Sequence, residues 1–358
     1  MNYIGSKRSL LPFLERHILE FSSPETNRAF FDVFAGTGAV GRHFKKLGFQ
    51  VISNDIQHYS YCLNRAYIGI NRPPAFCKLA NFFSDSANGL PDKAIDRVLD
   101  YLNRLAGCEG FVYRNYCLGG TVGTEFPRQY FTDENGKLCD AIRLQIEKWR
   151  QDKLISDNEY FYLLASLIEA VDKVANTASV YGAFLKRIKP SAQKSLKLER
   201  LDIIPSQKKH QVYQQPGASL ARSVACDILY IDPPYNQRQY ATNYHVLETI
   251  ARYDSPPLYG VTGLRDYEHQ KSDFCYRSKA LKSLESLIQN ATARYIFLSY
   301  NSEGLMPEQE VISMMKRYGK AELRQAAHRR FRADVNRASR RYKADQVTEY
   351  LFCLEKLA

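Results

Sequence analysis

One tetrapeptide constrains this chain more than any other feature: an aspartate, two prolines and a tyrosine at residues 232–235. It directly follows the apolar run 228–231, which has the length and composition of a buried strand. In open α/β sheets, ligands bind beyond the carboxyl ends of the strands. We therefore expect Asp232, Pro233, Pro234 and Tyr235 to line a ligand site at the edge of such a sheet.

The tetrapeptide suits chemistry on the exocyclic amine of adenine, whose lone pair is delocalised into the ring. Acceptors for the two amine hydrogens pull the nitrogen toward tetrahedral geometry, and Asp232 and the Pro233 carbonyl can supply them. Prolines fix φ and donate no N–H, so these acceptors stay directed into the site. Tyr235 offers a face for stacking a base taken out of a duplex. These residues predict methyl transfer to adenine; a proline-rich turn with a structural aspartate is the alternative.

A second motif lies at residues 30–41, where an apolar strand precedes a glycine loop and a helix expected from about Gly38 to Lys46. Its glycines fit the G-x-G-x-x-G pattern of nucleotide-binding loops. Asp55 follows a second apolar stretch, about 20 residues on, where a carboxylate accepts hydrogen bonds from ribose hydroxyls. The motif predicts a nucleoside ligand, either NAD or S-adenosylmethionine. The expected contacts are Phe34, Ala35, Gly36, Thr37, Gly38 and Asp55.

Asp32 helps to distinguish these two ligands. It lies just before the loop, where a dinucleotide would place its pyrophosphate at the helix N-terminus. A carboxylate there repels phosphate but attracts the ammonium and sulfonium of S-adenosylmethionine. S-adenosylmethionine is therefore the expected cofactor, with a brace between loop and helix as the other interpretation of Asp32. This chemistry requires no metal.

Together these blocks resemble the Dam-type (alpha-group) DNA N6-adenine methyltransferases, including those of restriction–modification systems. Three blocks match in the family's order: residues 3–7, residues 31–41 with Asp55 after them, and residues 232–240. The resemblance implies that Tyr3, Lys7, Asp55 and Asp232 contact the methyl donor or its immediate surroundings. It also implies that Asp232 and Tyr235 hold the target adenine.

One departure from the family concerns the strand before the tetrapeptide, where relatives often carry an acidic residue that contacts the adenine of the cofactor. Residues 211–217 contain no carboxylate here. Gln214, Gln215 or the amide of Gly217 can hydrogen-bond an adenine edge instead. The adenine end of the cofactor site stays open between these three.

The predicted fold is α/β: a mostly parallel, Rossmann-like S-adenosylmethionine-dependent methyltransferase sheet with helices on both faces. Residues 1–75 and 211–358 are expected to form this discontinuous catalytic domain. Residues 76–210 break the strand–helix alternation and are too long for a loop. Helical spacing at 94–102 and 160–174 predicts an inserted, mostly helical domain, and the resemblance makes it the target-recognition domain.

Composition agrees with a DNA-binding protein. The 358 residues carry a formal net charge of +12, which favours a polyanionic partner. No apolar stretch approaches the ~20 residues of a membrane span, and the first residues lack the apolar core of a signal peptide. The eight cysteines form no C-x-x-C pair, which argues against zinc and favours the cytoplasm.

Several segments outside the two motifs carry further predictions. Those expected to contact DNA are residues 121–131 with Arg128, Gln129 and Tyr130, the basic stretch 186–200, the glycine-containing loop 260–279, and the arginine-rich stretch 329–343. Arginine and glutamine can read base edges, whereas lysine more often contacts phosphates; a solvated face is the alternative for the lysines. Residues 242–248 are expected to form a helix behind the catalytic loop.

The sequence thus predicts an N6-adenine methyltransferase of double-stranded DNA in a bacterial cytoplasm, with a cognate restriction endonuclease as a candidate partner. An RNA or cytosine-N4 methyltransferase is one alternative, although an aspartate rather than a serine before Pro-Pro-Tyr favours adenine. A catalytically silent DNA-binding subunit is another, left open by the missing carboxylate at 211–217. An NAD dehydrogenase is disfavoured because no catalytic Tyr-x-x-x-Lys or His–Asp arrangement can be placed.

Overall fold

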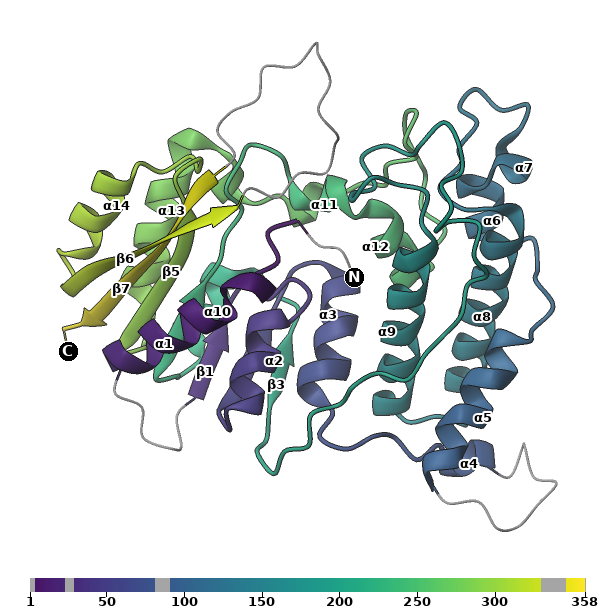
Figure 1. The fold of residues 1–358 in the computed structure, drawn as a ribbon, viewed down its shortest axis with the longest axis horizontal. Helices are drawn as coiled ribbons and strands as arrows, with labels where there is room; N and C mark the ends of the chain where they lie inside the picture. The colour runs from purple at the N-terminus through teal and green to yellow at the C-terminus, as the bar shows by residue number, and fades with distance from the viewer. Residues whose placement is uncertain (1–3, 23–28, 81–90, 330–345, 358) are drawn as a thin grey trace. The chain divides into compact units, whose positions relative to one another are not determined.

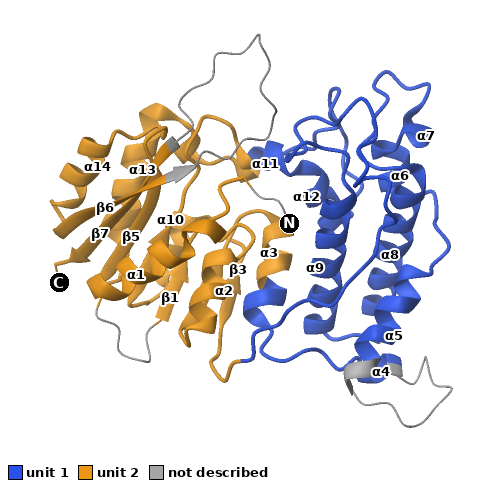
Figure 2. Ribbon diagram, viewed as in Figure 1, with its two compact units in different colours: residues 1–3, 65–205, 241–268 blue, residues 4–64, 206–240, 269–358 orange. Residues whose placement is uncertain are grey.

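The computed structural model describes residues 4–22, 29–80, 91–329 and 346–357 (Figure 1). The chain divides into two compact units (Figure 2): unit 1 comprises residues 1–3, 65–205 and 241–268, and unit 2 comprises residues 4–64, 206–240 and 269–358. Among the described residues, no helix combines the length and the apolar character that a membrane span needs.

Unit 2 is built on a seven-stranded sheet with the order β3-β2-β1-β4-β5-β7-β6. The strands are β1 (Ala29–Asp32), β2 (Gln50–Asn54), β3 (Gln211–Tyr213), β4 (Ile228–Ile231), β5 (Tyr295–Asn301), β6 (Gly319–Arg329) and β7 (Gln346–Lys356). The first five run parallel, whereas β7 is antiparallel to both of its neighbours. The strand order reverses between β1 and β4, and such switch points bind ligands in open α/β sheets. The predicted Rossmann-like sheet is confirmed.

Helices cover both faces of this sheet (Figure 1). One face carries α10 (Gly217–Ser223), α13 (Arg277–Asn290) and α14 (Glu308–Met315), and the other α1 (Leu11–Ser22), α2 (Ala39–Lys46) and α3 (His58–Asn64). Leu229 and Ile296 belong to the core under α10, α13 and α14. On the opposite face, Phe30 stacks on Phe44 of α2 with ring centroids 3.9 Å apart. Burial on both faces explains why these strands read as continuous apolar runs.

Unit 1 is mostly helical, as predicted for the insertion. Its elements are the π-helical turn η2 (Arg65–Gly69), α4 (Cys77–Ala80), α5 (Pro91–Asn103), α6 (Phe111–Tyr116), α7 (Leu118–Thr121), α8 (Asp133–Gln151), α9 (Asp157–Val174), all but the first residue of α11 (Tyr240–Asn243), and α12 (His245–Arg252). A capping box opens α9: the Ser156 side chain accepts the Glu159 N–H, and the Glu159 carboxylate accepts the Ser156 N–H. The helix expected at 160–174 is therefore confirmed.

Residues 241–268 pack with unit 1, although the sequence places them in the catalytic part of the chain. The helix expected at 242–248 is also interrupted, because Tyr244 separates α11 from α12. Arg143 of α8 donates to the carbonyls of Ile250 at 3.2 Å and Ala251 at 3.3 Å. These bonds satisfy carbonyls at the end of α12, which lack partners within the helix. Periodicity alone cannot reveal this packing, because α8 lies about a hundred residues away in the sequence.

Arg128 ties two segments of unit 1 together. Its side chain is buried and donates to three main-chain carbonyls, those of Gly260 at 3.0 Å, Val261 at 3.1 Å and Asn115 at 3.2 Å. Tyr130 is fully buried and also donates to main-chain carbonyls. The prediction that Arg128 and Tyr130 contact DNA is therefore wrong: both side chains brace the fold of unit 1.

We expect Arg128→Met to lower the free energy of unfolding of unit 1 by roughly 1–3 kcal/mol, because buried carbonyls lose a charged donor. Trp149 is the single tryptophan and lies buried in α8, so its fluorescence reports on unit 1 during urea unfolding. Arg114→Met, at an exposed arginine of α6, is the matched control. Equal stability of the two variants would contradict the bracing role.

Candidate active site at the sheet edge

The parallel strands bring polar residues from separate motifs to one edge of the sheet in unit 2. Asp32 ends β1, Asn54 ends β2, and Asp232 directly follows β4. The register pairs Asp32 with Ser53 on one side and with Tyr230 on the other. The two predicted motifs therefore meet at the switch point between β1 and β4.

The glycine loop at residues 35–38 is fastened to the residue that follows β2 and to α3. The Gly36 N–H donates to Asp55 Oδ2 at 2.8 Å, and the Asn64 side chain donates to the Gly36 carbonyl at 2.9 Å. Gly36 and Gly38 have φ angles of 51° and 75°, in the left-handed region that favours glycine. A Cβ on Gly38 would lie 2.7 Å from Asn64 Oδ1. The loop conformation therefore depends on glycine at both positions.

The other predicted cofactor contacts occupy different places around this loop. The Ala35 N–H donates to the Asn54 carbonyl at 2.9 Å, which joins the loop to the end of β2. The Phe34 ring meets Phe274 edge-on with centroids 5.4 Å apart. Thr37 is half-buried. Tyr3 lies outside the described residues.

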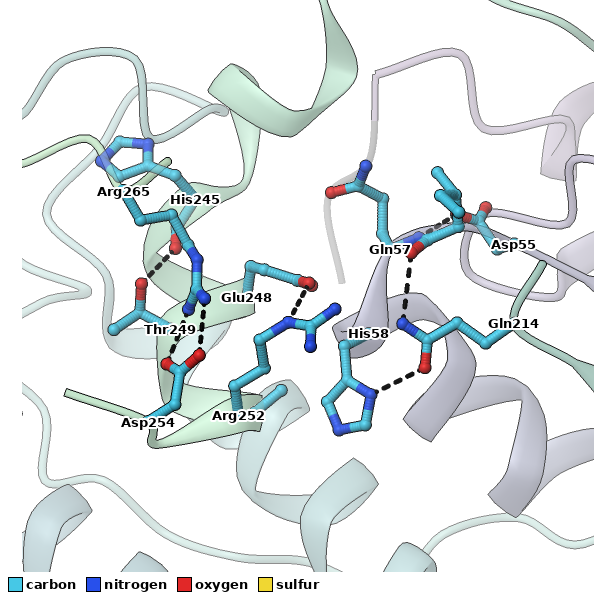
Figure 3. A network of polar contacts seen from close by, with 12 residues as sticks. Asp55, Gln57, His58, Gln214, His245, Glu248, Thr249, Arg252, Asp254 and Arg265 are labelled. Atoms are coloured by element: carbon cyan, nitrogen blue, oxygen red, sulfur yellow. Dashed lines mark hydrogen bonds and ion pairs between the residues drawn. The ribbon is translucent and has the colours of Figure 1, made fainter. Parts of the chain in front are cut away.

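Asp55 is oriented by the main chain on both sides. Besides the Gly36 N–H, it accepts the Gln57 N–H at Oδ1, at 2.9 Å (Figure 3). In the same network, the Gln214 side chain contacts His58 Nδ1 at 2.9 Å and donates to the Ile56 carbonyl at 3.2 Å. Both ends of the Gln214 amide are thus engaged within unit 2.

The adenine end of the cofactor site has three candidate contacts: Gln214, Gln215 and the amide of Gly217. Gln215 is exposed. The main chain of Gln215 is held by the Asn54 side chain, through bonds of 3.0 Å to its N–H and its carbonyl. Gly217 opens α10 against Val33, where a Cβ would lie 2.7 Å from Val33 Cγ1. Which of the three contacts the adenine edge stays a prediction.

Asp32 is a buried carboxylate with an unsatisfied oxygen. The residue is 1% exposed, and its Oδ1 has no hydrogen-bond partner among the described residues. Burial raises the pKa of Asp32 well above its ordinary value, and the nearby charges of Asp232 and Asp55 raise it further. An unpaired carboxylate oxygen is costly to bury, so the site suits a ligand that brings positive charge.

Asp232 lies in a cluster of polar side chains with Lys7, Tyr235 and Glu349. Lys7 Nζ is 3.5 Å from Asp232 Oδ1 and also 3.5 Å from Glu349 Oε2. Tyr235 donates its O–H to Asp232 Oδ1 at 2.5 Å, and its hydroxyl also contacts Lys7. Burial raises the pKa of Asp232 and Glu349 adds to this, whereas Lys7 and Tyr235 act in the opposite direction. The tetrapeptide aspartate is therefore held by a specific electrostatic environment.

The rest of the tetrapeptide completes this side of the site. Pro233 is buried and Pro234 half-buried. The Tyr235 ring meets Tyr300 edge-on at 4.8 Å between centroids, and Lys7 Nζ lies 4.6 Å from the centre of the Tyr235 ring. Stacking of Tyr235 on a target base stays a prediction.

Glu349 is a residue of this site that the sequence analysis does not predict. It reaches the cluster because β7 is antiparallel to β5, so that the first residues of β7 lie opposite the last residues of β5. The register pairs Glu349 with Asn301. The available signal was a carboxylate at the start of an otherwise apolar strand, and only the strand pairing shows where that carboxylate lies.

Unit 1 has a polar network of its own, which is also drawn in Figure 3. Arg265 binds Asp254 through two hydrogen bonds of 2.9 and 2.7 Å, and Arg252 donates to Glu248 at 2.7 Å. These pairs fasten the segment 241–268 internally. Both pairs lie within that segment, so they support its fold.

Comparison with known proteins gives consistent results along the whole chain. The model of the D12 class N6 adenine-specific DNA methyltransferase family matches residues 3–314. The type II methyltransferase M.NlaIII of Neisseria lactamica is 47% identical over 99% of both chains. M.FokI of Planomicrobium okeanokoites is 39% identical over 99% of this chain, which spans 53% of M.FokI. M.CviAII of Paramecium bursaria Chlorella virus 1 is 32% identical, covering 98% of this chain and 97% of the relative.

We expect Asp32→Asn to stabilise the ligand-free protein near neutral pH by at least about 1 kcal/mol, because the pKa of Asp32 is raised in the folded state. At pH values above 3.8, the ordinary pKa of an aspartate, Asp32 ionises more readily in the unfolded chain than in the folded protein. The wild type therefore loses stability as pH rises. The gain should therefore be larger at pH 8 than at pH 5. Urea unfolding followed by circular dichroism measures it.

Asp100→Asn, at an exposed aspartate of α5, is the control for this measurement and should change stability little at either pH. If Asp32→Asn destabilised the ligand-free protein at pH 8, the carboxylate would have a binding partner that the structure does not show.

Proposed function

Because this chain belongs to the D12 class N6 adenine-specific DNA methyltransferases, we propose that it transfers a methyl group from S-adenosylmethionine to adenine flipped out of double-stranded DNA. The observation that supports this most directly is the placement of Asp32 and Asp232 at the switch point, beside the glycine loop. The reaction needs a nucleoside methyl donor and a nucleobase, and the edge offers the buried carboxylate of Asp32 for the first and the half-buried carboxylate of Asp232 for the second.

Asp32 and the glycine loop fit the methyl donor. When bound, S-adenosylmethionine supplies an electrophilic methyl group on a sulfonium, and it also carries an ammonium. The unsatisfied Asp32 Oδ1 would gain a cationic partner, and the charges of Asp232 and Asp55 favour the same ligand. Asp55, oriented by the Gly36 amide, would accept the ribose hydroxyls. The remaining contacts proposed are Tyr3, Lys7, Phe34, Ala35, Gly36, Thr37, Gly38 and Asp232.

Asp232 and Pro233 fit the target base. The Asp232 carboxylate and the Pro233 carbonyl would accept the two hydrogens of the adenine amine, which frees its lone pair for attack on the methyl group. Pro234 would keep this turn rigid, and Tyr235 would stack on the base. A duplex hides the amine, so the base must leave the stack to reach Asp232. The proton would leave to water after transfer.

We propose that unit 1 contains the target-recognition surface expected at residues 76–210. Four of the basic residues predicted to contact DNA are exposed there, namely Lys186, Arg187, Lys194 and Lys197. The other two are used within the unit: Arg200 pairs with Asp96, and Lys189 donates to a main-chain carbonyl. Exposed lysine and arginine suit phosphate contacts.

The arginine-rich stretch 329–343 is proposed as a second DNA-contacting segment. It joins β6 to β7, which pair from Gly319 with Lys356 to Arg329 with Gln346. Two paired strands therefore flank the stretch, whereas the stretch itself, apart from the main chain of Arg329, lies outside the described residues.

The relatives named above are type II methyltransferases, and we propose that this chain works in a type II restriction–modification system. A cognate endonuclease that cuts the same site would be its functional partner, in a bacterial cytoplasm. An RNA substrate or cytosine-N4 transfer is disfavoured because the family acts on adenine in DNA.

We expect plasmid DNA from cells that express the protein to carry N6-methyladenine in one short motif, and Asp232→Ala to abolish it, since the amine loses its charged acceptor. Single-molecule sequencing identifies both the modification and the motif. Non-specific DNA binding should be nearly unchanged in the variant. Soluble wild-type protein that leaves no modified base would instead indicate an RNA substrate or a silent DNA-binding subunit.

We expect Asp55→Ala to weaken S-adenosylmethionine binding by ~1–3 kcal/mol, the usual range for a hydrogen bond to a charged group. Isothermal calorimetry measures the affinity directly. Asp273→Ala, which removes an exposed carboxylate of unit 2 paired with Lys279, is the matched control and should bind as the wild type does. Unchanged affinity in Asp55→Ala would displace the ribose assignment.

A further inference from the structure

Lys7 is a buried cation that lies midway between two carboxylates. The residue is 3% exposed, and its Nζ is 3.5 Å from both Asp232 Oδ1 and Glu349 Oε2. Both separations exceed the 2.7–3.2 Å of ordinary N–H···O bonds. Glu349 Oε2 has no hydrogen-bond partner among the described residues. Lys7 Nζ donates a hydrogen bond to the Tyr235 hydroxyl and makes a loose pair with each carboxylate. A small movement within this cluster could tighten either pair.

The position of Lys7 has a consequence for the proposed reaction. The adenine amine needs an electron-rich acceptor on Asp232, but Asp232 Oδ1 already accepts the Tyr235 O–H and faces the Lys7 ammonium. A cation at that oxygen competes with the amine for it and weakens it as an acceptor. For the reaction, the ammonium should lie farther from Asp232, while its charge still needs a partner because it is buried.

We propose that Glu349 is a positioning residue that draws the Lys7 ammonium away from Asp232 when the target adenine binds, and so leaves Asp232 Oδ1 open to the amine. This inference rests on the proposed function. Glu349 acts through Lys7 and is not itself placed against the base.

The two partners differ in mobility in the way that this role requires. Glu349 lies on β7, whose main chain is hydrogen-bonded to β5 on one side and to β6 on the other. Lys7 lies just before the short helix η1 (Arg8–Leu10), and its side chain has four rotatable bonds. The main chain of Glu349 is therefore held on both sides, and in this proposal the longer Lys7 side chain is the group that moves.

The charge on Glu349 also affects the pH dependence of activity. The titratable groups around Asp232 are Lys7, Tyr235, Tyr230, Asp32 and Glu349. Because Glu349 contributes to the raised pKa of Asp232, a neutral residue at 349 lowers that pKa. The acidic limb of kcat/KM should therefore move to lower pH in Glu349→Gln, even though the rate itself falls. A substitution that only loosened the packing would lower the rate without moving the acidic limb to lower pH.

The test compares Glu349→Gln with Glu355→Gln in the full-length protein. The control residue lies on the same strand and the same face, six positions on, and pairs with exposed Arg294. We expect kcat in Glu349→Gln to fall by roughly ten- to a hundredfold, as for loss of a charged interaction. KM for S-adenosylmethionine should stay near the wild-type value. Glu355→Gln should behave as the wild type, and Glu349→Asp should recover part of the rate.

A double-mutant cycle with Lys7→Met tests whether Glu349 acts through Lys7. If it does, Glu349→Gln should cause no further loss of kcat in the Lys7→Met background. The same cycle, scored on urea unfolding without methyl donor, should show a favourable coupling between the two residues. Wild-type kcat in Glu349→Gln, or an undiminished further loss in the Lys7→Met background, would overturn the inference. Absence of methylation by the wild type would overturn the proposed function instead.

Discussion

The crowding of carboxylates at one edge of the sheet is the constraint on which the rest of unit 2 depends. Asp232 and Asp55 both raise the pKa of Asp32 there, and Asp32 is almost completely buried. Among the described residues, Lys7 is the cation placed against Asp232. Like charges in a low-dielectric region repel strongly, so the arrangement persists only because the strands hold it.

The sheet topology explains why these residues meet although they are distant in sequence. β1 and β4 are neighbours, with nearly two hundred residues between them in the chain, and they place Asp32 and Asp232 at the same edge. The glycine loop is fixed to Asp55 and Asn64, so the main chain around the proposed donor site is set before any ligand arrives. Preorganisation of this kind lowers the entropy lost on binding.

The sequence predicted the parts of this structure that depend on local patterns. Residues 228–231 and the helix that begins after Gly38 were identified from apolar runs and glycines, because their burial follows from their own composition. Arg128 and Tyr130 were misjudged because composition cannot distinguish an arginine that contacts phosphate from one that binds carbonyls. Glu349 was missed because its position depends on an antiparallel pairing formed by the last strand of the sheet. Long-range pairing is thus what sequence reasoning lacked in each case.

The unsatisfied oxygen of Asp32 links stability to function in this molecule. The Asp32 carboxylate accepts main-chain hydrogen bonds from Phe34 and Gly41, but its Oδ1 has no hydrogen-bond partner among the described residues, and burying that oxygen destabilises the ligand-free fold. The same unpaired charge strengthens the binding of any cation that reaches it, because binding removes the cost. Proteins commonly retain such locally unfavourable residues at functional sites. Binding of a cationic ligand therefore removes the destabilisation that Asp32 causes in the free protein. For this reason the site favours a sulfonium or ammonium and disfavours a phosphate.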